Sequence, residues 1–336
     1  MDEGIGARVR RLLAGPRSQP SDAVGEDDVY FCYRLLLERE PDPEGARQWA
    51  ELLGQGLLSL PALVDGFLHS PERRALEARR REPQRVELEG FRIWVRAADP
   101  HIGRPIARDR SYEPHVTQAL RTHLRPGATF VDVGANVGYF SLLAALLVGE
   151  RGRVIAFEPR ADNVELLRRS VADNGFANVE VHACAVAERA QELAFFASGE
   201  VQSSGRLMQE REAGSELLPT VRAVALDEAL AAEPRVDVIK MDIEGAEPRA
   251  LAGMHALLRR HRPTLLTEFC PELLRTTSGV EPLAYLDALA VDHDLFVVPH
   301  DGGPELGPLP SDRILALHAA SARTHLDLAA YPRVRA

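Results

Sequence analysis

The chain has 336 residues, 45% of them hydrophobic and 27% charged, which is the composition of a soluble globular protein with room for one large domain and a small one. Its formal net charge of −10 argues against nucleic acid as the main partner, because binding phosphates requires a basic face. The cysteines Cys32, Cys184 and Cys270 are far apart and odd in number, which excludes a disulfide framework and favours a reducing cytoplasm.

The N-terminal residues 1–24 are expected to form a flexible segment, and they contain no apolar core long enough for a signal peptide. The apolar run Leu142 to Val148 is far short of the roughly 18 residues that a membrane-spanning helix needs. We therefore expect a cytoplasmic protein without a membrane span.

Residues 25–82 form a separate helical module according to their apolar spacing. Three helices are expected, at residues 29–37, 43–53 and 60–68, with Pro43 in a first turn and Ser59 as a cap. The arginine-rich stretch from Arg73 to Arg85 is interpreted as a solvated helix end and linker.

Residues 83–300 are predicted to form an α/β domain, which begins with a β-hairpin at 86–96 and a helix at 112–124. Five apolar strands are then expected, at residues 130–133, 154–157, 179–183, 236–241 and 265–269. Apolar strands joined by helices indicate a parallel sheet with helices on both faces. Residues 301–336 are assigned to a C-terminal extension, and the polar stretch from Ala197 to Thr220 to a strandless, mobile loop over the site.

A glycine-rich turn follows the first of these strands, in T-F-V-D-V-G-A-N-V-G-Y-F-S at residues 129–141. Gly134 and Gly138 can adopt backbone angles closed to other residues and leave room for a ligand. The helix after the turn begins with unpaired N–H groups and a partial positive charge. Since ligands of such sheets bind beyond the carboxyl ends of the strands, the pattern predicts a nucleotide-like ligand here.

The residues around the turn indicate which ligand. Glu158 ends the next strand, where a carboxylate can accept both hydroxyls of a ribose, although a strand-end glutamate in water is the alternative. A dinucleotide requires G-x-G-x-x-G, and Asn136 stands here in place of the middle glycine that lets the backbone touch the pyrophosphate. S-adenosylmethionine has no phosphate, and Asp132 at the strand end is a candidate acceptor for its ammonium group.

From Tyr112 to Val298 the chain resembles the FkbM family of S-adenosylmethionine-dependent methyltransferases. The matching motifs are Y-E-P (112–114), F-V-D-V-G-A-N-V-G-Y-F-S (130–141), V-I-A-F-E-P (154–159), V-E-V-H-A-C-A-V-A (179–187), I-K-M-D-I-E-G-A-E (239–247) and T-E-F (267–269). The resemblance implies a Rossmann-like methyltransferase fold and, as the usual activity, O-methylation, here of a sugar, glycan or secondary metabolite.

The resemblance also implies which residues bind the cofactor. The residues expected at its methionine end are Asp132, Gly134, Ala135, Asn136 and Gly138. Glu158 would bind the ribose, and Ala185 and Val186 would flank the adenine, in a C-A-V-A stretch that lacks the Ser-Asp pair often seen there.

Acidic residues gather after the strand that ends at Met241, where I-K-M-D-I-E-G-A-E contains Asp242, Glu244 and Glu247. Methyl transfer to a hydroxyl requires donor and acceptor held in line and a base within hydrogen-bond reach. Asp242 is the first candidate for contact with the reacting groups and Glu268 the second. Helix capping is the alternative role for Asp242, and Glu247 is expected to support the first helical turn through the helix dipole.

Lys240 is the single lysine among 40 Lys and Arg residues. Chance survival of one lysine is one explanation. The other is that a compact ammonium is required beside these acids, where it holds them in place or orients the acceptor. We favour the second explanation and group Lys240 with Asp242 and Glu268 as catalytic residues.

We predict no required metal ion. His115, His182 and His300 lie near segments that face the site, but they form no ligand spacing such as H-E-x-x-H, and surface or core histidines are the favoured explanation. The carboxylates could still hold Mg²⁺.

The helical module resembles a small helical domain of unknown function that is related in pattern to phycobilisome linkers. The motif that carries this resemblance is Y-R-L-L-L-E-R-E-P-D-P-E-G, at residues 33–45. It implies a docking or substrate-recruiting module that binds a protein partner.

Two other functions remain open. A nicotinamide-dependent oxidoreductase could use the same sheet, although the sequence has no recognisable Tyr-x-x-x-Lys hydride site. In a non-catalytic scaffold, the N-terminal module would be the functional part and the large domain would only bind a ligand.

Overall fold

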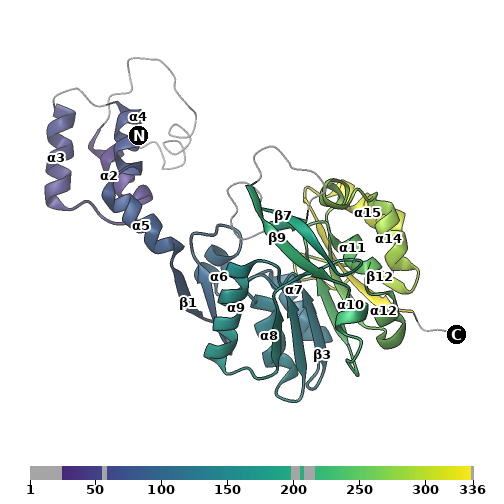
Figure 1. Ribbon diagram of the computed structural model, residues 1–336. Coiled ribbons are helices and arrows are strands. Elements are labelled where there is room, and N and C mark those ends of the chain that lie inside the picture. Colours follow the sequence, from purple (N-terminus) through teal and green to yellow (C-terminus); the bar gives the residue numbers. More distant parts are fainter. Residues whose placement is uncertain (1–24, 55–58, 198–204, 208–215, 334–336) are drawn as a thin grey trace. The chain divides into compact units, whose positions relative to one another are not determined.

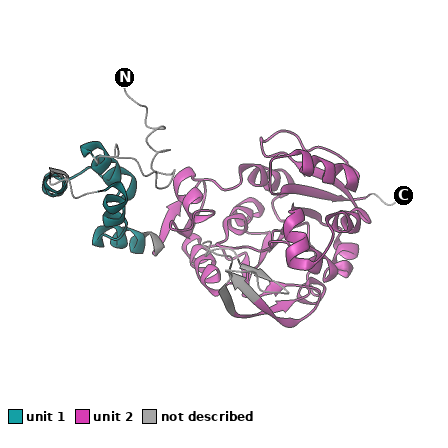
Figure 2. Cartoon of the chain, turned by 90° about the horizontal axis from the view of Figure 1, so that it is seen from above, with its two compact units in different colours: residues 1–81 teal, residues 82–336 magenta. Residues whose placement is uncertain are grey.

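The computed structural model describes four stretches of the chain, residues 25–54, 59–197, 205–207 and 216–333. The chain divides into two compact units, Met1–Arg81 and Glu82–Ala336 (Figure 2). The predicted flexible segment, residues 1–24, lies outside the described residues and stays a prediction.

The first unit is helical, as predicted (Figure 1). Its helices are α2 (Glu26–Leu36), α3 (Pro43–Gly54), α4 (Leu60–Leu68) and α5 (Pro71–Arg81). Phe67 lies at the centre of a small aromatic core, with Tyr33 edge-on and Trp49 stacked, each at a centroid distance of 4.9 Å. The Oγ of Ser59 accepts a hydrogen bond from the N–H of Ala62 at 3.4 Å, which confirms the predicted cap of α4.

The arginine-rich stretch was interpreted as a solvated helix end and linker, and most of it is helical, since residues 73–81 belong to α5. Arg73 makes an i,i+4 ion pair with Glu77 at 2.9 Å and donates a hydrogen bond to the carbonyl of Leu36 at 2.7 Å. These contacts give the helix partners within the first unit, and only Glu82 lies between α5 and β1.

The second unit is built on a seven-stranded sheet with the order β12-β13-β11-β10-β3-β4-β5 (Figure 1). Its strands are β3 (Thr129–Val133), β4 (Arg153–Phe157), β5 (Val179–His182), β10 (Val238–Met241), β11 (Thr264–Phe269), β12 (His293–Val298) and β13 (Leu326–Pro332). The pairs from β11 to β5 are parallel, and β13 is antiparallel to both its neighbours. The predicted Rossmann-like α/β fold is thus confirmed.

Helices and a hairpin complete the second unit. The predicted hairpin is confirmed by the antiparallel pair β1 (Pro83–Glu87) and β2 (Arg92–Arg96). The helical segments are α6 (Gly103–Asp109), α7 (Pro114–His123), α8 (Tyr139–Val148), α9 (Ala161–Asn174), α10 (Leu226–Ala229), α11 (Glu247–Ala252), α12 (His255–His261), α13 (Pro271–Leu273), η1 (Leu274–Ser278), α14 (Pro282–Ala290) and α15 (Ser311–Ala320).

The C-terminal boundary differs from the prediction. Strand β13 comes from residues 301–336, which were assigned to an extension, and it lies between β11 and β12. Leu328, Ala329 and Ala330 on this strand are fully buried. Because the sheet is incomplete without β13, the α/β domain extends beyond residue 300.

The stretch from Ala197 to Thr220 is not strandless. A second, four-stranded sheet contains β6 (Ala185–Val186), β9 (Glu216–Val224), β7 (Gln191–Ala197) and β8 (Gly205–Leu207), in that order. Val221 and Ala223, which lie on β9 just beyond this stretch, alternate along the strand and pack with Ala185 and Leu193. The polar composition of residues 197–220 concealed the strand residues within it. Residues 198–204 and 208–215 lie outside the described part, so a mobile loop there stays a prediction.

Alternate residues of the central strands face opposite helical layers. Phe130 and Val238 belong to the apolar cluster that includes residues of α6 to α9, whereas Val131 and Ile239 belong to the cluster that includes residues of α10 to α12, α14 and α15. Because side chains alternate along a strand, Asp132 faces the same side of the sheet as Phe130, and Lys240 the same side as Val238. This alternation puts Asp132 and Lys240 on the α8 side, where they are partners in the parallel register of β3 and β10.

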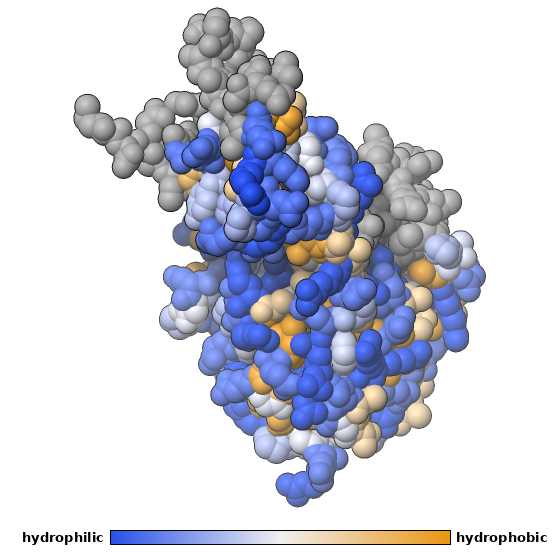
Figure 3. Space-filling view, turned by 90° about the vertical axis from the view of Figure 1, so that its left-hand side faces the viewer, coloured by the Kyte–Doolittle hydropathy of each residue, from blue (hydrophilic) through white to orange (hydrophobic). Residues whose placement is uncertain are grey.

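The surface adds no membrane-spanning element. Hydrophilic side chains predominate on the face drawn in Figure 3, with hydrophobic ones scattered among them. Among the described residues, no helix is both long and apolar enough to cross a membrane.

The glycines of the turn after β3 are required by contacts within the protein. Gly134 has φ +85, and a Cβ there would lie 2.0 Å from the carbonyl oxygen of Asp242. Gly138 has φ +96, and a Cβ there would lie 2.2 Å from Cδ1 of Leu167. These glycines adopt the unusual backbone angles that were expected, and the absence of a Cβ lets the turn pack against the end of β10 and against α9. That they also leave room for a ligand stays a prediction.

We predict that Gly134→Ala lowers the free energy of unfolding by roughly 1–3 kcal/mol more than Gly127→Ala, as measured by chemical denaturation. Gly127 is a matched control because its φ is +84 and a Cβ there would meet nothing within 4 Å. Gly127→Ala introduces only the strain of a positive φ, whereas Gly134→Ala introduces that strain and also the clash with the carbonyl oxygen of Asp242. Equal losses in the two variants would show that the close approach to Asp242 has no energetic importance.

Candidate functional site

A cavity of about 670 Å³ opens at the carboxyl ends of β3, β4, β10 and β11. This is the edge at which open parallel sheets bind their ligands. Residues of the glycine turn and of the segments after β4 and β5 line one part of it, and a group of acids lines another.

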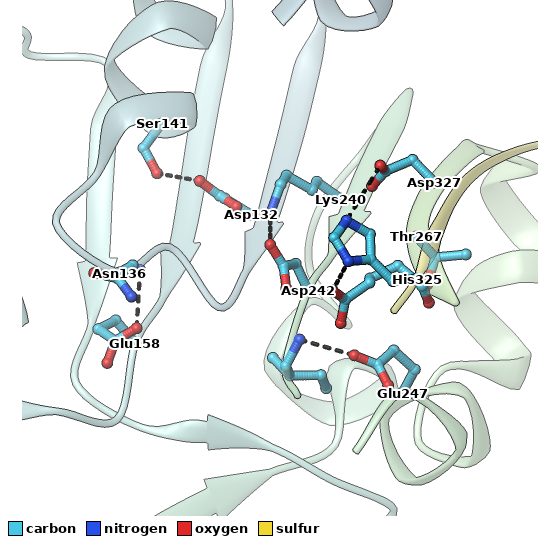
Figure 4. A network of polar contacts seen from close by, with 12 residues as sticks. Asp132, Asn136, Ser141, Glu158, Lys240, Asp242, Glu247, Thr267, His325 and Asp327 are labelled. Carbon is cyan, nitrogen blue, oxygen red and sulfur yellow. Dashed lines mark hydrogen bonds and ion pairs between the residues drawn. The ribbon is translucent and has the colours of Figure 1, made fainter. Parts of the chain in front are cut away.

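Glu158 provides a buried carboxylate in the first part of the cavity. Its Oε2 accepts the N–H of Asn136 at 2.9 Å and its Oε1 accepts the N–H of Arg160 at 2.8 Å (Figure 4). Burial raises the pKa of Glu158 to about 7, although these backbone donors oppose the shift. Each carboxylate oxygen has two lone pairs, so Glu158 can still accept hydrogen bonds from a ligand.

The amide N–H groups of the turn are all used within the protein. Gly134 and Ala135 both donate to the carbonyl of Phe157 at 3.0 Å. Asn136 donates to Glu158, and Gly138 donates to the carbonyl of Ala135 at 2.8 Å.

The remaining amide, that of Val137, donates to Oδ1 of Asn136 at 2.8 Å. Asn136 has φ +50, which brings its side chain back onto the turn. The N–H groups of residues 134–138 are therefore all paired within the protein, whereas the expectation of unpaired N–H groups concerns the start of α8 at Tyr139 and stays a prediction.

Six of the eight predicted cofactor-binding residues line the cavity: Gly134, Ala135, Asn136, Glu158, Ala185 and Val186. Gly138 and Asp132 are not among the lining residues. Asp132 is fully buried, and its Oδ2 accepts the hydroxyl of Ser141 on α8 at 2.6 Å (Figure 4). Asp132 is therefore placed to hold α8 against β3, and it is not exposed as an acceptor for a ligand's ammonium.

The three predicted catalytic residues, Lys240, Asp242 and Glu268, all line the same cavity. The Nζ of Lys240 lies 3.0 Å from Oδ2 of Asp242 and 4.8 Å from the centroid of the Phe140 ring (Figure 4). Burial disfavours the charge of Lys240, but the nearby carboxylates of Asp242, Asp132 and Glu113 raise its pKa above the ordinary value. Lys240 is therefore a buried cation held by acids.

The alternative role of Asp242 as a helix cap is not observed, because α11 has Ala246 at its N-cap position and no side-chain cap hydrogen bond among the described residues. Glu247, the first residue of α11, accepts the N–H of Ile243 through Oε1 at 2.8 Å (Figure 4). Asp242 is directed to Lys240 instead. Burial raises the pKa of Glu247 to about 8, so this carboxyl is mostly protonated at pH 7.

Glu268 is a second acid of the cavity. Its Oε1 lies 3.6 Å from Nδ1 of His325, and its buried Oε2 makes no hydrogen bond with the described residues. Burial raises the pKa of Glu268 well above its ordinary value, and Asp242 adds to the shift. His325 also lines the cavity but was missed, because it belongs to the segment assigned to the extension.

Glu113 is a third acid of the cavity, and the sequence analysis did not select it. Burial and then the charge of Asp242 raise its pKa to about 7, while Lys240 opposes the shift. Its φ of +38 is in the left-handed region, just before α7 begins at Pro114. The Y-E-P motif was the available signal, but it was considered only as an approach to the pocket.

His115 and His300, two of the three histidines considered in the sequence, lie together behind the acidic part of the cavity. Nε2 of His115 lies 2.7 Å from Oδ2 of Asp327, and Nε2 of His300 lies 3.3 Å from the same oxygen. Burial, followed by the charge of His115, lowers the pKa of His300 to about 4. His182 lies elsewhere, stacked on Phe157 at a centroid distance of 4.8 Å.

Residues 132–281 match the family model of the methyltransferase FkbM domain. Residues 18–76 match a family described as domain of unknown function DUF4214. The first match includes the glycine turn, Glu158 and the three predicted catalytic residues, so this segment is similar to the methyltransferase FkbM domain. The second supports the helical domain of unknown function but not the likeness to phycobilisome linkers.

Curated relatives match shorter segments. A probable cobalt-precorrin-6B C(15)-methyltransferase (decarboxylating) of Sulfolobus acidocaldarius is 41% identical over 69 residues, which are 20% of this chain and 36% of the relative. A protein-L-isoaspartate O-methyltransferase of Methanococcoides burtonii is 29% identical over 114 residues, 33% of this chain and 55% of the relative. The chain therefore spans about a third of the first relative and just over half of the second.

Among solved structures, a methyltransferase FkbM from Methylobacillus flagellatus KT aligns with 97% of this chain and 70% of its own. The TM-score is 0.39 and the sequence identity is 17%.

We predict that Glu247→Gln reduces the loss of stability between pH 6 and pH 9. The pKa of Glu247 is about 8 in the folded protein and near 4.5 when unfolded, so its stabilising contribution is complete below pH 4.5 and disappears as the pH rises through 8. Between pH 6 and pH 9 this contribution falls by roughly 2–3 kcal/mol. Urea denaturation at both pH values measures the difference between parent and variant.

The control is Glu165→Gln, which neutralises an exposed glutamate of α9 and should retain the pH dependence of the parent. If Glu247→Gln also loses as much stability as the parent, the carboxyl of Glu247 does not titrate in this range.

Proposed function

We propose that this protein transfers a methyl group from S-adenosylmethionine to a hydroxyl of a sugar, glycan or secondary metabolite. The proposal is carried by one cavity that combines the buried carboxylate of Glu158 with the acids Asp242 and Glu268. The match of residues 132–281 to the methyltransferase FkbM domain supports methyl transfer as the chemistry.

The turn at residues 134–138 supports a ligand without a pyrophosphate. A pyrophosphate is usually bound by free backbone N–H groups at such a turn. Here each of these N–H groups already donates within the protein, and the side chain of Asn136 covers part of the turn. S-adenosylmethionine requires no phosphate site, whereas a nicotinamide dinucleotide does.

The remaining lining fits an adenosine. Glu158 can accept the ribose hydroxyls, as carboxylates at this strand end do in nucleotide-binding sheets. Ala185 and Val186, both buried and at the cavity wall, present apolar surface for the adenine. Along this edge of the sheet, the ribose would then lie at β4, the adenine after β5, and the methyl acceptor near β10 and β11.

Bound S-adenosylmethionine would supply a methyl group on a sulfonium, and the acceptor oxygen would bond to the methyl carbon in line as the carbon–sulfur bond breaks and S-adenosylhomocysteine leaves. In our proposal Asp242 accepts the proton of the acceptor hydroxyl, because its carboxylate lies in the cavity at the end of β10. Lys240 fixes Asp242 through the 3.0 Å contact. Glu268 binds a second polar group of the acceptor, for which its free Oε2 is available within the described site.

The N-terminal unit and the cellular location are further parts of the proposal. We propose that the helical unit docks a protein partner, since it has its own core and matches a separate family. A cytoplasmic location is supported by the cysteines Cys32, Cys184 and Cys270, which are free and buried.

We predict that titration calorimetry detects binding of S-adenosylmethionine and S-adenosylhomocysteine, and no binding of NADH. Glu158→Gln should weaken S-adenosylhomocysteine binding about 10- to 100-fold, because one or two charge-assisted hydrogen bonds are lost. The control Glu165→Gln, on the exposed side of α9, should bind as the parent does. Absence of heat with both adenosyl compounds overturns the proposal, and heat with NADH favours an oxidoreductase.

The catalytic prediction requires an acceptor, which is found by screening with labelled methyl donor. With that acceptor, we predict that Asp242→Asn lowers kcat at least about 100-fold, because the base is lost. S-adenosylhomocysteine affinity should stay within about threefold of the parent, since Asp242 contacts the acceptor in this scheme. Glu244→Gln changes another acid of the cavity and serves as the control. Unchanged kcat in Asp242→Asn rules out this base, and failure to form S-adenosylhomocysteine with any acceptor favours the scaffold.

A further inference from the structure

We infer that His115, His300 and Asp327 form a binding site for a divalent transition metal, with Zn²⁺ as the ion that best suits the three ligands. The inference is independent of the proposed methyl transfer, because it concerns side chains behind the cavity wall and can be tested by metal binding alone. It replaces the expectation that the histidines have no metal role.

The three side chains come from distant parts of the sequence. His115 lies in the first turn of α7, His300 follows β12, and Asp327 is on β13. One ligand atom of each lies within 4.8 Å of the other two. The shortest separation is 2.7 Å, between Nε2 of His115 and Oδ2 of Asp327, followed by 3.3 Å from Nε2 of His300 to the same oxygen.

These separations suit a small tetrahedral ion. With zinc–ligand bonds of about 2.0–2.2 Å, tetrahedral geometry separates neighbouring ligand atoms by roughly 3.3–3.6 Å. The contact of His300 with Asp327 is already at that spacing, and the contact of His115 must lengthen by less than about 1 Å. Small side-chain rotations are therefore sufficient to admit the ion.

The hydrogen bonding of His300 is incomplete among the described residues. Nε2 of His300 is buried and makes no hydrogen bond with the described residues, although it faces a carboxylate. The rings of His115 and His300 stack at a centroid distance of 3.9 Å, so two imidazoles present nitrogen to one oxygen. A third, His325, has its Nε2 at 3.9 Å from that oxygen (Figure 4). A cation bound between these groups would be coordinated by the imidazole nitrogens and by the carboxylate of Asp327.

The chemistry of the ligands selects the class of metal. Mg²⁺ and Ca²⁺ prefer oxygen ligands, whereas two imidazoles and one carboxylate suit Zn²⁺ and related first-row ions. Three protein ligands leave a fourth position, and His325 is the nearest further nitrogen. The side chains of His300 and Asp327 are 15% and 16% exposed, so an ion can reach the site from solvent.

A bound ion would connect the site to the cavity. His325 lies between Asp327 and Glu268, and Glu268 lines the cavity. The ion would link three parts of the fold behind Glu268: α7, the residues that follow β12, and strand β13 itself. We therefore assign it a positioning role for the wall that carries Glu268 and His325.

The test is zinc binding to the full chain, produced without a histidine tag and treated with a chelator. Calorimetry with ZnCl₂ should give one equivalent per chain, and Co²⁺ should give visible absorption bands of a four- or five-coordinate ion. His300→Ala should weaken zinc binding by at least about tenfold and abolish the cobalt bands. The matched control His255→Ala removes an exposed histidine of α12 and should leave both signals unchanged.

Asp327→Asn keeps the shape of the ligand residue and provides a second variant if circular dichroism shows that His300→Ala is unfolded. No zinc binding by the parent overturns the inference, as does parent-like binding by both variants, which would assign the zinc to other residues. Zinc binding in a protein that fails to bind S-adenosylmethionine would leave this inference intact and remove only the proposed function.

Discussion

The buried ammonium of Lys240 is the constraint on which the site depends. A cation removed from water is stable only where carboxylates compensate it, so its position requires acids on the neighbouring elements. Asp132 lies beside it in the strand register, and Asp242 contacts it from two residues further along the same strand. The one lysine of the chain thus joins β3 to β10 at the edge where the cavity opens.

The acids of this edge outnumber the cation that faces them. Glu113, Glu158, Glu247 and Glu268 all have pKa values raised chiefly by burial. The pKa values of about 7 for Glu113 and Glu158 and about 8 for Glu247 allow these carboxyls to exchange protons near neutral pH. Lys240 opposes the shift at Glu113, so its position favours the ionised form of that acid.

The sequence predicted the parts of the fold that depend on local pattern. Apolar strands such as Phe130–Val133 are buried on both faces, and this produces a continuous apolar run that is readable without a structure. Strand β13 has the sequence L-D-L-A-A-Y-P, with small residues and an aspartate, and it runs antiparallel to β11, beginning near Glu268. Its pattern resembles that of a terminal tail, so it was missed.

The site was predictable only where a motif brings the residues together in sequence. Lys240 and Asp242 are two residues apart on one strand, and a strand-end motif identified both. The group of His115, His300 and Asp327 is separated by more than half of the chain, and only the sheet order brings these side chains together. The glycine turn was predicted from the room it leaves for a ligand, and the structure adds that Gly134 lies close against the carbonyl oxygen of Asp242.

The insertion of β13 has a consequence for how the chain is made. In the sheet, β12 is bonded to β13 and not to β11, so this edge of the sheet cannot form until residues 326–332 are available. On a ribosome, the strands from β3 to β11 are complete well before that point, and β12 must wait without its ladder partner. A chain interrupted before β13 would leave an unpaired strand edge open to association with other chains.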